Sequence, residues 1–203
     1  MCGRYRNLQT WSDLHSALQL FVGPVDQPAL NLEPMPQVRP TNSVPIVRHT
    51  DEGFRVSNAR WWLVPWFHKG FNARAETVAT SRAYRDSFKH RRCLVPSDGW
   101  YEWMGPHPEN DKRKQPWLFT ARDGEPMMFA GIWDRCETAD QGVVESFTII
   151  TQPAGSSLNG YHDRAPVVLF GDEWTRWLDV QDEVTDLLGP ESRDRFLVEI
   201  AAI

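Results

Sequence analysis

Short apolar stretches with strand character recur along the whole chain, and they constrain its fold more than any other feature. Each is four to seven residues long, and Pro, Gly, Asn or Asp separates most of them from the next. They are Val44–Arg48, Phe54–Asn58, Trp61–Val64, Arg92–Val95, Trp100–Met104, Pro116–Thr120, Met127–Trp133, Glu145–Thr151 and Pro166–Phe170. Many short strands with few helices predict an α+β fold built around a strongly curved, barrel-like and mainly antiparallel β-sheet.

Helical patterns are few and short. Thr10 and Asp13 form a capping box that predicts a helix over residues 10–20. The polar segment Pro106–Lys114 predicts an exposed hairpin loop. Because the chain has 203 residues and no repeat or linker, we expect residues 1–203 to form a single domain with a few short helices.

No segment of the sequence is long and apolar enough to cross a bilayer, since the longest apolar run, residues 61–67, has seven residues and is interrupted by Pro65. The first residues lack the apolar stretch of a signal peptide, so we expect a monomeric, cytoplasmic protein, associated with the nucleoid if its source is bacterial. Cys2, Cys93 and Cys136 are too scattered for a disulfide framework or a zinc site. We therefore expect no membrane contact, no metal and no cofactor.

The net charge conceals an asymmetry along the chain. The 22 Lys and Arg against 27 Asp and Glu give −5, a sign that by itself argues against a nucleic-acid partner. Residues 1–100, however, carry 13 basic and 8 acidic side chains, and 18 of the 22 basic residues are Arg, whose planar fork suits phosphate. Trp side chains supply surfaces on which bases stack, although we expect most of one subset in the core: Trp11, Trp61, Trp62, Trp117, Trp133, Trp174 and Trp177.

The second residue, Cys2, stands where it can carry unusual chemistry. Because methionine is generally removed before a small residue, the mature chain would begin with Cys2 and carry an α-amine and a thiol on adjacent carbons. Ordinary pKa values of about 7.7–8 for the amine and about 8.5 for the thiol leave both reactive at neutral pH. Such a group condenses with an aldehyde to a Schiff base and closes to a thiazolidine, or attacks a carbonyl with its own amine as base. Position alone is equally consistent with a plain residue near a disordered end.

Two further polar groups lie in unusual surroundings. Strand alternation puts Glu102 on the same face as Trp100 and on the opposite face from Trp103, and desolvation among aromatic residues would raise its pKa toward an acid/base value. An ion pair with one of the many Arg residues is the alternative that spacing alone favours. His162 has Asp163 beside it, but neighbours on a strand point apart, so this pairing is weak evidence for an oriented imidazole.

Four separate blocks, in this order and at this spacing, resemble the SRAP family (SOS-response-associated peptidase). They are Met1–Arg4, Asn72–Thr77, Arg92–Trp103 and His162–Pro166, and the resemblance extends to about Leu169. It implies an SRAP-like fold and single-stranded DNA containing abasic sites as the partner. It also implies a stable thiazolidine crosslink between the N-terminal Cys and the ring-opened aldehyde of the abasic site.

The resemblance also implies roles for individual residues. Cys2 matches the crosslinking residue, through both its amine and its sulfur, and Glu102 matches the carboxyl that moves protons. His162 matches the histidine that assists sugar ring opening, and Asn72 the amide that holds the N-terminus and the sugar. The implied DNA contacts are phosphate-binding arginines and aromatic residues that pack on bases: Arg4, Arg74, Arg164, Trp66 and Trp103.

The sequence departs from the family pattern at three places. Ala165 stands where Met is usual, Leu63 stands where Gly is usual, and the chain ends at Ile203 without a longer C-terminal strand segment. These changes concern stability and the edge of the DNA groove more than the chemistry. Two other functions stay open: a thiol peptidase with Cys2 as nucleophile, for which the sequence shows neither a peptide groove nor an oxyanion hole, and a module that binds single-stranded DNA without a covalent bond.

Overall fold

Five strands close into a barrel. The computed structural model describes residues 2–25, 27, 29–63, 70–107, 110–190 and 195–203. Around the barrel the strands are β4 (Gly53–Trp61), β3 (Ser43–Thr50), β6 (Arg92–Ser97), β9 (Met127–Thr138) and β10 (Gly142–Pro153). The ring closes because β10 pairs antiparallel with β9 and parallel with β4. The predicted barrel-like, mainly antiparallel sheet is confirmed.

Three short strands extend the barrel wall beside the ring. β5 (Asn72–Arg74) and β11 (Arg164–Pro166) both pair with the C-terminal half of β10, and β12 (Val168–Phe170) pairs with β9. Residues 72–74 and 164–166 therefore lie on the two sides of one strand, although about 90 residues separate them in the sequence. This arrangement brings two of the four sequence blocks together.

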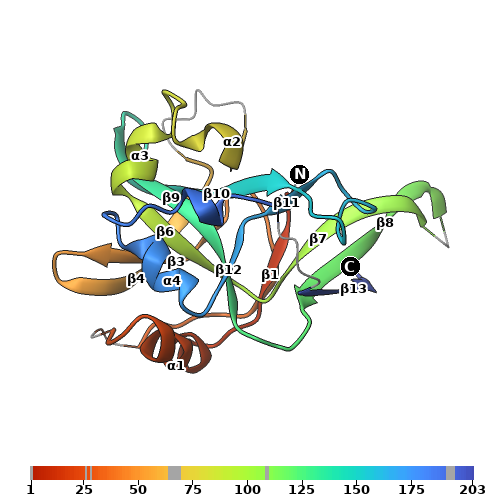
Figure 1. Ribbon diagram of the computed structural model, residues 1–203, viewed down its shortest axis with the longest axis horizontal. Helices are drawn as coiled ribbons and strands as arrows, with labels where there is room; N and C mark the ends of the chain where they lie inside the picture. Colours follow the sequence, from red (N-terminus) through yellow and green to blue (C-terminus); the bar gives the residue numbers. More distant parts are fainter. Residues whose placement is uncertain (1, 26, 28, 64–69, 108–109, 191–194) are drawn as a thin grey trace.

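A second sheet packs beside the barrel. Its strand order is β13 (Phe196–Ile200), β8 (Asn110–Ala121), β7 (Gly99–His107), β1 (Tyr5–Asn7) and β2 (Met35–Val38). The hairpin of β7 and β8 projects to the right in Figure 1. The hairpin predicted at Pro106–Lys114 is present, but its loop is shorter than predicted, because the two strands continue to pair until His107 faces Asn110. Residues 108–109 of this segment lie outside the described residues.

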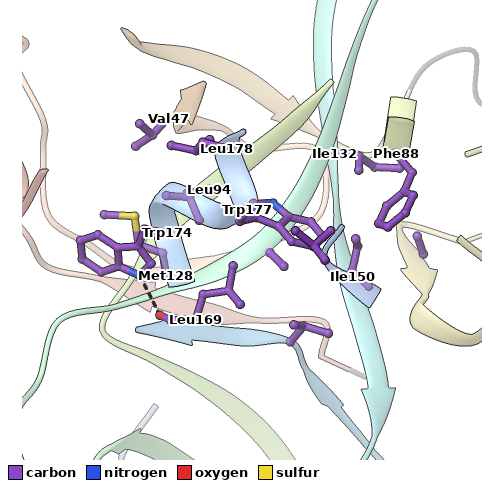
Figure 2. Close-up of a cluster of buried hydrophobic side chains, with 14 of the residues drawn as sticks. Val47, Phe88, Leu94, Met128, Ile132, Ile150, Leu169, Trp174, Trp177 and Leu178 are labelled. Atoms are coloured by element: carbon purple, nitrogen blue, oxygen red, sulfur yellow. Dashed lines mark hydrogen bonds between the residues drawn. The ribbon is translucent and has the colours of Figure 1, made fainter. Parts of the chain in front are cut away.

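Short helices cover the outer wall of the barrel. α1 (Trp11–Phe21) begins after Thr10, whose hydroxyl and backbone N–H form the predicted capping box with Asp13. The other helical segments are α2 (Ala75–Val78), α3 (Arg85–His90), α4 (Glu173–Leu178) and the 3₁₀ turn η1 (Thr185–Leu187). Figure 2 shows α4 laying Trp174, Trp177 and Leu178 against side chains of the wall.

The barrel wall is buried on both faces, which explains its uninterrupted apolar runs. Along β6, Leu94 points outward to the helices, whereas Cys93 and Val95 belong to a second cluster with Trp61 and Trp100. Cys93 is therefore a packing residue. Of the seven Trp expected mostly in the core, Trp61, Trp174 and Trp177 are fully buried, and the others are half-buried: Trp11, Trp62, Trp117 and Trp133.

The family departures lie in well-packed surroundings. The strand predicted over Phe54–Asn58 continues as β4 to Trp61, whereas the separate strand predicted over Trp61–Val64 is wrong at residues 62 and 63, and residue 64 lies outside the described residues. Trp62 has φ of 125°, a backbone region that favours glycine. Leu63 behind it is buried, and so is Ala165 on β11. The turn after β4 thus forms without glycine, and Trp62 adopts the strained backbone conformation. At the C-terminal side, β13 pairs along β8.

Candidate active site

Pairing between β1 and β7 brings Cys2 to Glu102. The two strands are antiparallel with Tyr5 opposite Trp100, so the residues preceding Tyr5 run along the residues that follow Trp100. Both side chains are buried, with exposed fractions of 0% for Cys2 and 4% for Glu102. Burial first, and then the Glu102 charge, raise the pKa of the Cys2 thiol well above its ordinary value, so this thiol is protonated at neutral pH.

Asn72 anchors Cys2 from the other sheet. The Asn72 side-chain N–H donates to the Cys2 carbonyl oxygen at 2.6 Å. Its own amide oxygen accepts from the Trp61 indole N–H at 3.3 Å, which orients the amide so that its nitrogen faces Cys2. Trp61 also donates to the Phe71 carbonyl at 3.1 Å. A chain of hydrogen bonds from the barrel core therefore holds the backbone of Cys2 in place.

Glu102 and His162 face one another across the site. The distance from His162 Nε2 to Glu102 Oε2 is 3.9 Å, longer than a hydrogen bond and short enough for a small polar group to bridge. Burial raises the pKa of Glu102 to about 7, and the nearby Asp163 charge adds to this. Glu102 thus holds both protonation states near neutral pH, which is the condition for acid/base work.

The His162 imidazole is held by groups on its other nitrogen. The Arg164 backbone N–H donates to Nδ1 at 2.9 Å, so the neutral ring carries its proton on Nε2, toward Glu102. Asp163 Oδ1 lies 2.7 Å from the same Nδ1 and is placed to accept a hydrogen bond from it when the ring is charged. Burial lowers the pKa of His162, and the neutral ring is therefore the main form at neutral pH. The expectation that Asp163 points away is wrong, because both residues precede β11 rather than lying on it.

A hollow of about 450 Å³ opens beside His162. It is lined by Gly70, Asn72, Arg74, Thr151, His162, Asp163 and Arg164. Arg74 is exposed at its rim, at the end of β5. Arg164, by contrast, is already engaged, since its guanidinium forms a two-pronged ion pair with Glu76. The hollow thus has Arg74, Arg164, His162 and the Asp163 carboxylate in its lining, and Glu102, which does not line it, lies 3.9 Å from His162.

The remaining residues predicted to contact DNA lie elsewhere. The Arg4 guanidinium sits 4.6 Å from the centre of the Trp103 ring, in a cation–π contact. Trp103 packs near Tyr101, on the face of β7 opposite Glu102, as strand alternation predicts. Neither Arg4 nor Trp103 lines the hollow. Trp66 lies outside the described residues.

Three residues of the site carry no clear signal in the sequence. Trp61 reads as one of many core aromatic residues, Glu76 as a surface carboxylate and Thr151 as part of a strand. Their roles arise from contacts across the fold: Trp61 orients Asn72, and Glu76 and Thr151 both bind the Arg164 guanidinium. Only a contact map or co-variation between distant positions would reveal such pairs.

The described residues build no other evident reactive centre. Among them no group of three His, Cys, Asp or Glu side chains is close enough to hold a metal ion. Burial raises the pKa of the Cys93 thiol far above its ordinary value, which leaves it inert. In the same described part of the chain, no helix has the length and apolar character needed to span a membrane.

Several relatives can be aligned with this chain over most of its length. The chain is 33% identical over 186 residues to the abasic site processing protein YedK of Escherichia coli, covering 88% of this chain and 79% of YedK. It is 27% identical to the abasic site processing protein YoqW of Bacillus subtilis, covering 93% and 84% of the two chains. The abasic site processing protein HMCES of Xenopus tropicalis matches 65% of this chain at 33% identity, over 48% of its own length.

Solved structures show the same fold. A Bacteroides thetaiotaomicron protein superposes with a TM-score of 0.80 at 24% identity, covering 99% of this chain and 92% of the other. A phage-related protein of Bordetella bronchiseptica superposes with a TM-score of 0.76 at 24% identity, covering 98% of this chain and 94% of the other.

The family model described as SOS response associated peptidase (SRAP) matches residues 1–199. The chain therefore belongs to the SRAP family.

Proposed function

We propose that this protein binds single-stranded DNA and captures abasic sites covalently through Cys2. The observation that carries the proposal is the placement of Cys2. Its carbonyl accepts a hydrogen bond from Asn72, which lines the hollow with Arg74 and Arg164, and it lies near Glu102, which is 3.9 Å from His162. The names of the relatives, all abasic site processing proteins, support the same substrate. The crosslink would shield the lesion for as long as it persists.

The proposed chemistry uses both groups of an N-terminal Cys2. After Met1 is removed, the α-amine adds to the aldehyde carbon of the ring-opened sugar, and loss of water gives an imine. The thiol sulfur then bonds to that carbon while its proton passes to the imine nitrogen, which closes the five-membered thiazolidine. The product weighs the sum of protein and DNA less one water, and nothing is oxidised or reduced.

Burial of the thiol decides the order of these two steps. Because the pKa of the Cys2 thiol is raised, little thiolate exists to attack the aldehyde directly. The amine, freed from Met1, is the better first nucleophile, and the sulfur closes the ring once an imine lies beside it. We assign proton transfer in both steps to Glu102. We assign assistance of sugar ring opening to His162, whose Nε2 lies 3.9 Å from Glu102 Oε2.

The proposal is tested by two measurements on the purified protein. Mass spectrometry should show a chain that lacks Met1, since a retained methionine blocks the amine. Incubation with a single strand carrying one abasic site should then yield a slow-migrating band on a denaturing gel, with a mass equal to the sum of protein and DNA less one water. A complex seen only on a native gel would indicate non-covalent binding. A thiol that cleaves peptides without forming the adduct would instead support the peptidase function.

Arg74 provides a test of the DNA-binding surface. We expect Arg74→Ala to weaken binding of single-stranded DNA and to lower the slope of log affinity against log salt by about 0.7, the value for one lost phosphate contact. Arg55→Ala is the matched control, because Arg55 is an exposed arginine on β4 that does not line the hollow. Fluorescence anisotropy at several salt concentrations measures both quantities. An unchanged slope would argue against a phosphate contact at Arg74.

A further inference from the structure

Two different groups hold the Arg164 guanidinium. Its Nη1 and Nη2 atoms donate to the two carboxylate oxygens of Glu76, the Nη2 bond being 2.9 Å long. Nη2 also donates to the backbone carbonyl of Thr151 at 2.6 Å and to its hydroxyl at 3.3 Å. A phosphate group prefers the same two-pronged edge that Glu76 occupies.

Glu76 carries a full negative charge in this position. The hydrogen bond from Arg164 lowers its pKa, and the charge of Arg74 contributes in the same direction. Glu76 lies on α2, which follows β5 directly, and its side chain is 45% exposed, compared with 13% for Arg164. The carboxylate therefore neutralises cationic charge at the rim of the hollow from a position that can move toward solvent.

Thr151 binds the Arg164 guanidinium independently of Glu76, so Glu76 is not the only group that positions this arginine. Thr151 belongs to β10, and its carbonyl binds the guanidinium independently of Glu76. Arg164 would accordingly keep its place in the hollow without the carboxylate. Glu76 is therefore not needed to position the arginine, but it does occupy the edge that a phosphate would use.

We propose that Glu76 is a built-in competitor for DNA phosphate at Arg164, which a strand must displace in order to bind. The proposal rests on the proposed function, since it assigns the hollow to the DNA backbone. Its consequence is weak binding of undamaged single strands. A strand that passes the site without an aldehyde gains little from Arg164, whereas one that reacts with Cys2 is retained by the covalent bond.

The test compares Glu76→Gln with the unaltered protein on a lesion-free single strand, using fluorescence anisotropy. We expect Glu76→Gln to bind about three- to tenfold more tightly at low salt, with a salt slope steeper by about 0.7. Glu52→Gln is the matched control, because Glu52 forms a similar ion pair with Arg55 at the β3–β4 turn, which Figure 1 places at the far left. It should change neither quantity.

Two further variants and one separate readout make the outcome decisive. Glu76→Asp keeps the charge and should stay within about twofold of the unaltered protein, and the gain from Glu76→Gln should vanish in an Arg164→Gln background. Unchanged or weaker binding by Glu76→Gln, with an unchanged melting temperature, overturns the inference. Formation of the adduct by the unaltered protein is scored separately, so a failure of the proposed function would be seen independently.

Discussion

Cys2→Ala is expected to abolish the adduct that survives denaturation while leaving native binding of single-stranded DNA within about twofold. The reason is chemical, because alanine keeps the α-amine and loses only the sulfur. The amine can still form an imine, but imines hydrolyse, and no thiol remains to close the ring. The side chain of Cys2 is fully buried and does not line the hollow, so its loss should leave the DNA-binding surface intact.

Reduction with borohydride tests imine formation separately from closure of the thiazolidine ring. Reduction should trap the Cys2→Ala imine as a stable secondary amine, so that a denaturant-resistant band returns only when reductant is present. The unaltered protein should give its band with or without reductant. Cys93→Ala is the matched control, since Cys93 is equally buried and sits in the barrel wall away from the hollow. A persistent adduct in Cys2→Ala without reductant would show that another residue is the linker.

Glu102→Gln is expected to slow adduct formation by about 10²-fold or more while native binding changes little. The carboxyl holds a proton below pH 7 and loses it above, because burial raises its pKa to about 7. Loss of water from the first amine–aldehyde adduct needs an acid, so the rate in the unaltered protein should fall as the pH rises above about 7. Glu102→Gln should lack this alkaline fall. Equal losses in rate and binding would contradict an acid/base role.

We expect the same substitution to raise stability above neutral pH, and a measured rise would exclude unfolding as the cause of lost activity. A pKa raised from an ordinary value near 4.5 means that the folded state favours the protonated carboxyl. This contribution to stability is complete below about pH 4.5 and is lost as the pH rises through about 7. A neutral Gln does not titrate, so we expect Glu102→Gln to melt at a higher temperature than the unaltered protein at pH 8. Thermal melts near pH 4.5 should show little difference.

Local elements of the fold could be predicted where the signal lies within a few residues. The helix after Thr10 follows from a capping box, and the β3–β4 hairpin follows from two apolar runs around a turn that ends in Gly53, which has φ of 102°. The length of the β7–β8 hairpin could not be predicted from the sequence, because the polar residues near its tip resemble a loop. Cross-strand pairing extends the strands through them.

The candidate site likewise has features that the sequence predicts and features that it does not. Cys2 and Glu102 stand out from the sequence through position and aromatic surroundings, and the resemblance adds Asn72 and His162. The orientation of Asn72 by Trp61 could not be predicted, since the two residues are eleven positions apart and the end of β4 lies between them.

By itself the sequence determined the candidate reactive groups: a cysteine at the second position, a carboxyl among aromatic residues, and arginines concentrated away from the acidic C-terminal part. It also determined the class of fold, because strand and helix periodicities are local properties of the chain. Only the tertiary structure decided that Glu102 is buried against Cys2 and that Arg164 is paired with Glu76, 88 positions away. The physical reason is that desolvation and ion pairing depend on which distant residues barrel closure brings together. Charge totals along the sequence do not contain that information.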